Sequence, residues 1–173
     1  ASGLATHTIV AGGQQACDPH ESGYGPLRAH EPIIIDIFPR SQKTGYFGDI
    51  TRTVVRGHAS EAVRRLYDTV LQGQKLAFRK VRAGVPTGEP HRAVQDYFVA
   101  QGYKTARRHG RLQGFFHGTG HGLGLEIHEP PRMSATSTGK LKPGQVVTIE
   151  PGLYYPELGG VRLEDVALVT QNG

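Results

Sequence analysis

The chain of 173 residues is long enough for one domain with a substantial core, and too short for two of ordinary size. Its 20 basic and 15 acidic side chains give a net charge of +5, but the basic residues are not interleaved with aromatic ones and no nucleic-acid recognition motif occurs. No apolar run of about 18 residues is present. The sequence therefore predicts neither a nucleic-acid partner nor a membrane span.

The single cysteine, Cys17, cannot form an internal disulfide, and the first residues lack the pattern of a secretory signal peptide. Both observations favour a cytoplasmic protein. The sequence opens on a β-type stretch, THTIVAGG (6–13), and closes on DVALVTQNG (165–173), directly after another β-type run. We therefore expect a piece of a longer protein.

Two β-branched runs, EPIIIDIF (31–38) and DITRTVVRG (49–57), predict a hairpin with a long loop. A helix capped by Ser60 is expected over residues 60–84, and a shorter one over 90–100. Three later stretches are typical of strands, namely GLGLEIH (122–128), QVVTIE (145–150) and GVRLEDVALVT (160–170). This order predicts an α+β domain whose helices lie on one side of an antiparallel sheet.

Four acidic residues occupy strand positions that should be apolar if one strand face is buried: Asp36, Asp49, Glu150 and Glu164. A buried, unpaired carboxylate costs several kcal/mol. An exposed face or an ion pair would explain any one of them, but four in one small domain indicate a shared site. If the hairpin pairs around residues 42–43, Asp36 faces Asp49, with their β-carbons about 4.5–5.5 Å apart.

Two carboxylates at that separation repel each other unless a cation lies between them. Two divalent cations about 3.5–4 Å apart would balance the four negative charges. Hard oxygen ligands favour manganese-like ions, and one imidazole would complete such a site.

The stretch HGTGHGLGLEIH (117–128) supplies three imidazoles, from His117, His121 and His128. Its four glycines argue against a helical zinc motif and predict an extended backbone that another strand or a ligand approaches closely. One imidazole is therefore expected to complete the metal site, while the others handle substrate and protons. The remaining histidines apart from His20 are expected to be surface or hydrogen-bonded residues: His7, His30, His58, His91 and His109.

Four segments, in this order, resemble the signature segments of the Xaa-Pro aminopeptidase and prolidase family, which has the pita-bread fold and includes methionine aminopeptidase and creatinase as relatives. The segments are GYFGDITRTVVRG (45–57), HGTGHGLGLEIHEPP (117–131), TIEPGLYYP (148–156) and GGVRLEDVALVT (159–170). The resemblance implies that residues 1–173 form a partial catalytic domain. The family's first catalytic helices and its N-terminal domain would lie upstream.

The resemblance also implies a dinuclear site with two divalent ions, Mn²⁺ by preference, with Co²⁺ or Zn²⁺ as alternatives. Its ligands would be Asp36, Asp49, His121, Glu150 and Glu164, with Asp49 and Glu164 bridging the ions. His117 and His128 would flank the substrate carbonyl, and Arg162 would contact the ligands. His20 would line the substrate pocket.

One segment departs from the family pattern. The family has glycine two residues after its first aspartate, whereas this chain has Phe38 followed by Pro39 and a loop longer by two residues. Pro39 lacks an N–H, so strand pairing should stop there. Phe38 points to the same face as Asp36 and would narrow the pocket.

We therefore expect metal-assisted hydrolysis of Xaa-Pro bonds at the N-terminus of peptides, with Glu150 accepting the proton of the attacking water and delivering it to the leaving nitrogen. His128 would stabilise the oxyanion and His117 would position substrate or relay protons. The alternatives are a methionine-aminopeptidase-like or dipeptide-only enzyme, a creatinase-like amidinohydrolase, and a catalytically inactive pita-bread binding module. Homo-oligomerisation stays open.

Overall fold

The computed structural model describes residues 8–172, so His7 and the start of the predicted opening strand lie outside the described residues. The two helices are α1 (Glu61–Phe78) and α2 (Glu89–Ala100). Before them come β1 (Ile9–Gly12), the short 3₁₀ helix η1 (Gln15–Cys17), β2 (Pro32–Ile37) and β3 (Ile50–Val55). After them come β4 (Ala106–Arg108), β5 (Arg111–Gln113), β6 (Gly120–Gly122), β7 (Glu129–Met133), β8 (Val146–Ile149), β9 (Gly152–Tyr155), β10 (Gly159–Arg162) and β11 (Asp165–Leu168).

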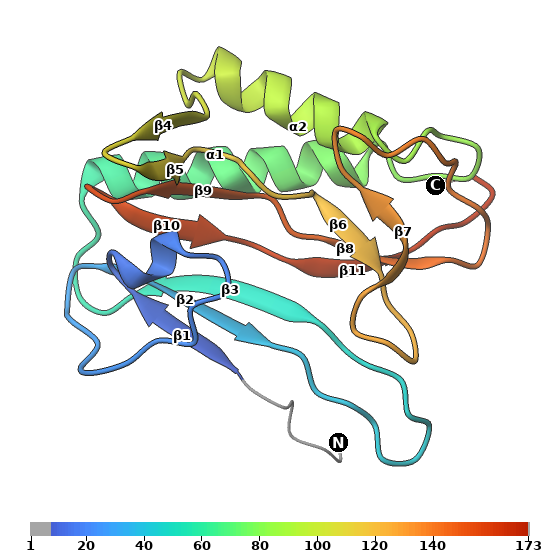
Figure 1. Cartoon of the computed structure of the whole chain (residues 1–173), viewed down its shortest axis with the longest axis horizontal. Helices are drawn as coiled ribbons and strands as arrows, with labels where there is room; N and C mark the ends of the chain where they lie inside the picture. The colour runs from blue at the N-terminus through green and yellow to red at the C-terminus, as the bar shows by residue number, and fades with distance from the viewer. Residues whose placement is uncertain (1–7, 173) are drawn as a thin grey trace.

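The strands form antiparallel ladders with the orders β1-β2-β3, β11-β8-β6-β7, β9-β10 and β4-β5. Both helices lie along one side of the layer that β8 to β11 form, and the β1-β2-β3 sheet lies on the other side of that layer (Figure 1). This arrangement confirms the predicted α+β class with helices segregated to one side. Within residues 8–172, no helix combines the length and the apolar character needed to span a membrane.

The start of α1 follows from local capping. The Ser60 hydroxyl accepts a hydrogen bond from the Val63 N–H at 3.2 Å, as predicted for the start of α1. The predicted end at Gly84 is wrong, because α1 stops at Phe78 and the chain continues in tight turns through Val81. The apolar face of α1, including the fully buried Leu66, packs into the main core.

The hairpin forms, but its predicted register is wrong by two residues. Asp36 lies across from Thr51, because the turn is centred one position further along and includes Gly45 at a φ of +77°. Side chains alternate between sheet faces with a period of two, so Asp49 still projects to the same face as Asp36. The pairing is interrupted at Pro39 and resumes in a bridge between Arg40 and Phe47.

Two other strand predictions need correction. The predicted strand over 122–128 does not form, because β6 ends at Gly122 and residues 124–128 form bends. A Cβ at Gly120 would collide with the Thr148 carbonyl, so the expected close approach of another strand is confirmed. The predicted strand over 160–170 is interrupted at Leu163 and Glu164, where the Glu164 N–H binds the Thr51 carbonyl at 3.1 Å.

Candidate metal centre

A cavity of about 690 Å³ opens between the β1-β2-β3 sheet and the strands β6 and β8. It brings together every site residue that the sequence predicted. The lining includes His20, Asp36, Asp49, His117, His121, His128, Glu150, Arg162 and Glu164.

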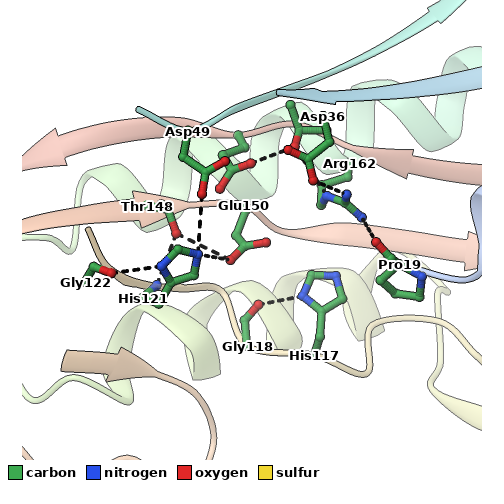
Figure 2. A network of polar contacts seen from close by, with 12 residues as sticks. Pro19, Asp36, Asp49, His117, Gly118, His121, Gly122, Thr148, Glu150 and Arg162 are labelled. Atoms are coloured by element: carbon green, nitrogen blue, oxygen red, sulfur yellow. Dashed lines mark hydrogen bonds and ion pairs between the residues drawn. The ribbon is translucent and has the colours of Figure 1, made fainter. Parts of the chain in front are cut away.

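The five predicted metal ligands come from different strands and converge at strand ends and at a strand break. Asp36 projects from β2 and Asp49 immediately precedes β3, whereas His121 is the central residue of β6. Glu150 follows β8, and Glu164 lies in the break between β10 and β11. Figure 2 shows the two aspartates on one side of the site and His121 on the other.

One cluster is compact enough to hold a cation. Ligand atoms of Asp49, His121 and Glu164 all lie within 4.8 Å of one another. The Nε2 atom of His121 is 3.7 Å from Asp49 Oδ2 and 3.3 Å from Glu150 Oε1.

The tautomer of His121 decides what these short distances mean. Its Nδ1 lies 3.0 Å from the Gly122 carbonyl oxygen, which can only accept, so Nδ1 carries the ring proton. Burial lowers the imidazole pKa from 6.5 to about 4, and the ring is therefore neutral at pH 7. Its Nε2 lone pair then faces two carboxylate oxygens. These three atoms are all acceptors, and a cation between them would be bound by all three.

Asp36 supplies an independent test of fit. Its Oδ2 accepts a hydrogen bond from Arg162 Nη2 at 2.7 Å. Its Oδ1 is buried and has no hydrogen-bond partner among the described residues. Leaving a buried charged acceptor unsatisfied costs more than about 1–3 kcal/mol, and a divalent cation at this position would remove that cost. The donor set of oxygens and one imidazole fits such an ion.

The carboxyl pKa values show how strongly these negative charges oppose one another. Burial and the charge of Glu164 raise the pKa of Asp49 from 3.8 to about 8. Burial and the charge of Asp36 raise the pKa of Glu164 to about 7, and burial and the charge of Glu164 raise the pKa of Glu150 well above its ordinary value. Bound divalent cations reverse this repulsion, so their binding would release protons.

The metal-free chain is expected to lose stability as the pH rises from 6.5 to 8. Because the Asp49 pKa is about 8 when folded and 3.8 ordinarily, its contribution to stability is lost as the pH rises toward 8. The His121 pKa is lowered from 6.5, so its opposite contribution changes only below pH 6.5. Thermal unfolding at pH 6.5 and 8 should give a lower Tm at pH 8, and added divalent ions should abolish the difference. An equal or higher metal-free Tm at pH 8 would contradict this account.

His117 is held by a residue that the sequence reasoning missed. Its Nδ1 donates to the Gly118 carbonyl, and its Nε2 lies 2.7 Å from the hydroxyl of the fully buried Tyr154. That hydroxyl accepts from Arg162 Nη1 at 3.2 Å, so its own proton points to His117. A polar aromatic four residues after Glu150, inside a buried strand, is the sequence signal that could have identified Tyr154.

The other predicted pocket histidines lie at the cavity rim. His128 is exposed, and its ring meets the His121 ring edge-on, with centroids 4.3 Å apart. Partial desolvation of its ring and the nearby charge of Arg132 lower the pKa of His128 below its ordinary value. His20 is exposed and lines the cavity.

The histidines expected to have no site role agree with that interpretation where the structure describes them. His91 is buried with its Nδ1 at 3.1 Å from Thr119 Oγ1. His30 Nδ1 accepts from the backbone N–H of His58 at 3.0 Å. His109 is exposed in the turn between β4 and β5.

Comparison with known proteins identifies close relatives. The profile of metallopeptidase family M24 matches residues 1–171. A curated Xaa-Pro dipeptidase of Pyrococcus furiosus is 38% identical over 167 residues, covering 96% of this chain and 45% of the relative. The chain thus spans about half the length of the curated relatives that it matches.

Solved structures agree with the sequence match. The prolidase from Pyrococcus furiosus superposes with a TM-score of 0.89 at 38% identity, over 99% of this chain and 49% of that one. The X-Pro aminopeptidase from Thermotoga maritima superposes with a TM-score of 0.88 at 30% identity, over 99% of this chain and 47% of that one. The predicted pita-bread fold is thereby confirmed. Because the M24 profile also matches residues 1–171, the chain belongs to metallopeptidase family M24.

Proposed function

We propose that this chain is the catalytic part of a dinuclear-metal-dependent peptidase that cleaves Xaa-Pro bonds at the N-terminus of peptides. The observation that carries the proposal is the convergence of three carboxylates, from Asp49, Glu150 and Glu164, on the neutral imidazole of His121. In the same cavity, Asp36 Oδ1 has no hydrogen-bond partner among the described residues. Two bound ions, Mn²⁺ by preference for this oxygen-rich set, would supply a water molecule of lowered pKa and a Lewis acid for the carbonyl.

Each residue around the cavity then has a separate task. Glu150 is the most accessible of the four site carboxylates, with a side chain 19% exposed, and is placed to accept a proton and return it to the leaving nitrogen. His128 is neutral at pH 7 because its pKa is lowered below 6.5, so its single ring N–H can donate to the developing oxyanion. His117, held by Tyr154, positions the substrate.

The walls of the cavity suit an apolar dipeptide unit. Phe38, Phe47, Ile127 and Ile9 line it beside the polar residues. A proline ring is apolar, and its nitrogen has no hydrogen to donate once it is part of a peptide bond. An apolar wall therefore suits proline, because the ring needs no hydrogen-bond acceptor from the protein. The relatives named as Xaa-Pro dipeptidase and X-Pro aminopeptidase support the same class of substrate.

Arg132 favours a short peptide with a free carboxylate near the scissile bond. It lies across from His121 in the β6–β7 ladder and lines the cavity. No described carboxylate forms an ion pair with it. A guanidinium is well suited to bind a terminal carboxylate in two parallel hydrogen bonds.

Arg132→Ala is therefore expected to raise KM for Xaa-Pro dipeptides by at least about 10- to 100-fold, because even one hydrogen bond to a charged group contributes that much, with a smaller change in kcat. The exposed Arg107→Ala, on β4, should behave like the unsubstituted chain. Steady-state kinetics on a dipeptide and on its C-terminal amide separate the cases. An unchanged KM for the dipeptide would show that Arg132 does not bind the carboxylate.

The function itself is tested by assaying the manganese-loaded chain on Xaa-Pro dipeptides, longer Xaa-Pro peptides and peptides that begin with methionine. Cleavage of dipeptides alone identifies a prolidase, and cleavage of the longer Xaa-Pro peptides identifies an Xaa-Pro aminopeptidase. Release of methionine without a following proline would support the methionine-aminopeptidase-like alternative. A chain that binds metal and cleaves none of them would be a binding module.

A further inference from the structure

Two buried threonines contact the acidic residues of the site, and neither was singled out from the sequence. Thr51 Oγ1 lies 2.6 Å from Glu164 Oε2, and Thr148 Oγ1 lies 3.4 Å from Glu150 Oε1. Both threonines are fully buried. Each hydroxyl donates to its carboxylate, and a carboxylate that binds a metal ion is ionised and can only accept.

The surroundings of Thr51 fix the direction of its proton. Arg162 Nε–H approaches Thr51 Oγ1 at 3.4 Å, and the guanidinium has no capacity to accept. The single hydroxyl proton is therefore directed to Glu164. The backbone reinforces this contact, because the Glu164 N–H donates to the Thr51 carbonyl. The two residues thereby form an antiparallel β-bridge between β3 and the segment that precedes β11.

Thr148 repeats the same arrangement on a different strand. Its Oγ1 accepts from the backbone N–H of His121 at 3.1 Å, which leaves its own proton for Glu150 (Figure 2). In each case the threonine hydroxyl accepts a hydrogen bond from an N–H group and donates its own proton to a carboxylate. The shorter distance makes Thr51 the stronger of the two contacts.

We propose that Thr51 and Thr148 are positioning residues that hold the carboxylates of Glu164 and Glu150 in the orientation needed to bind metal; this rests on the proposed function. An oxygen that accepts one hydrogen bond keeps a second lone pair for a cation. Without the hydroxyl, binding must itself order the carboxylate. Loss of such an outer partner typically lowers metal affinity about 10- to 100-fold.

Thr53 offers a matched control two residues along the same strand and on the same face. It is buried, but its hydroxyl contacts only the backbone of Arg162, donating to the carbonyl at 2.8 Å and accepting from the N–H at 3.0 Å. Thr53→Val removes a buried hydroxyl without touching a carboxylate. It therefore reports the general cost of the substitution.

The experiment titrates Co²⁺ into the metal-free chain and records both the affinity and the visible absorption spectrum of the bound ion. Thr51→Val is expected to weaken Co²⁺ binding about 10- to 100-fold and to change the spectrum. Thr51→Ser, which restores the hydroxyl, should recover most of the affinity. Thr53→Val should bind Co²⁺ as the unsubstituted chain does, even if its Tm falls.

The outcomes separate this proposal from the proposed function. An unsubstituted chain that binds no Co²⁺ overturns both. Co²⁺ binding by the unsubstituted chain together with unchanged affinity and spectrum in Thr51→Val overturns the positioning role alone. If Thr51→Val does not fold, Thr148→Val, with Thr148→Ser as its rescue, applies the same comparison to Glu150, and unchanged binding there overturns the proposal.

Discussion

Asp49→Ala is expected to abolish binding of the two metal ions while leaving the metal-free fold intact. Asp49 belongs to the compact cluster, with its ligand atom within 4.8 Å of those of His121 and Glu164. Loss of a residue that only orients a metal ligand lowers metal affinity by up to about 100-fold. Loss of the charged ligand itself should lower the affinity further. The raised pKa of Asp49 shows that the metal-free fold disfavours its charge, so removing it should not lower the metal-free Tm at pH 8.

Elemental analysis and thermal unfolding of the variant measure both effects. The exposed Asp68→Ala, on α1, is the matched control and should keep the metal content of the unsubstituted chain. Undiminished metal in Asp49→Ala would show that the cluster is not the binding site. A large fall in metal-free Tm would show that Asp49 stabilises the fold by itself.

Glu150→Gln is expected to lower kcat by about 10²- to 10⁴-fold, the range that a general acid–base group contributes, with a smaller change in KM. Glutamine keeps the shape of the side chain and an oxygen that can accept from Thr148, but its amide cannot take up a proton. Glu150 lines the cavity beside the other site carboxylates, where its side chain can exchange a proton with bound water and substrate.

The variant must be assayed with metal bound, so metal content is measured on the same sample. The exposed Glu157→Gln serves as control and should retain full activity. A kcat within about tenfold of the unsubstituted value, at equal metal content, would assign the proton transfer to another group.

The acidic residues of the site could be predicted from the sequence because a two-residue shift in strand register leaves every side chain on the same face of the sheet. The predicted hairpin register was wrong by two residues, yet Asp36 and Asp49 share a face in either register. A displacement by one residue would have sent one of them to the opposite face. The glycines predict only an extended backbone that another strand approaches closely, and the choice of His121 among the three histidines follows from the family resemblance.

The parts that could not be predicted depend on contacts between distant segments. Tyr154 and Thr51 acquire their roles from Arg162 and Glu164, which local sequence patterns do not place beside them. The segment 123–128 carries alternating apolar residues but bends away after Gly122. In that segment the Gly124 carbonyl accepts from the Phe47 N–H at 2.9 Å, so a contact with the distant hairpin loop holds it in place of a ladder.

The central claim is that this chain holds a dinuclear metal centre, and its metal content is the most direct test. The purified chain should be incubated with Mn²⁺ at pH 8, dialysed and subjected to elemental analysis. The account predicts about two divalent ions per chain, since a pair of ions is needed to balance the four carboxylates. A chain that retains no divalent ion under these conditions would contradict the account.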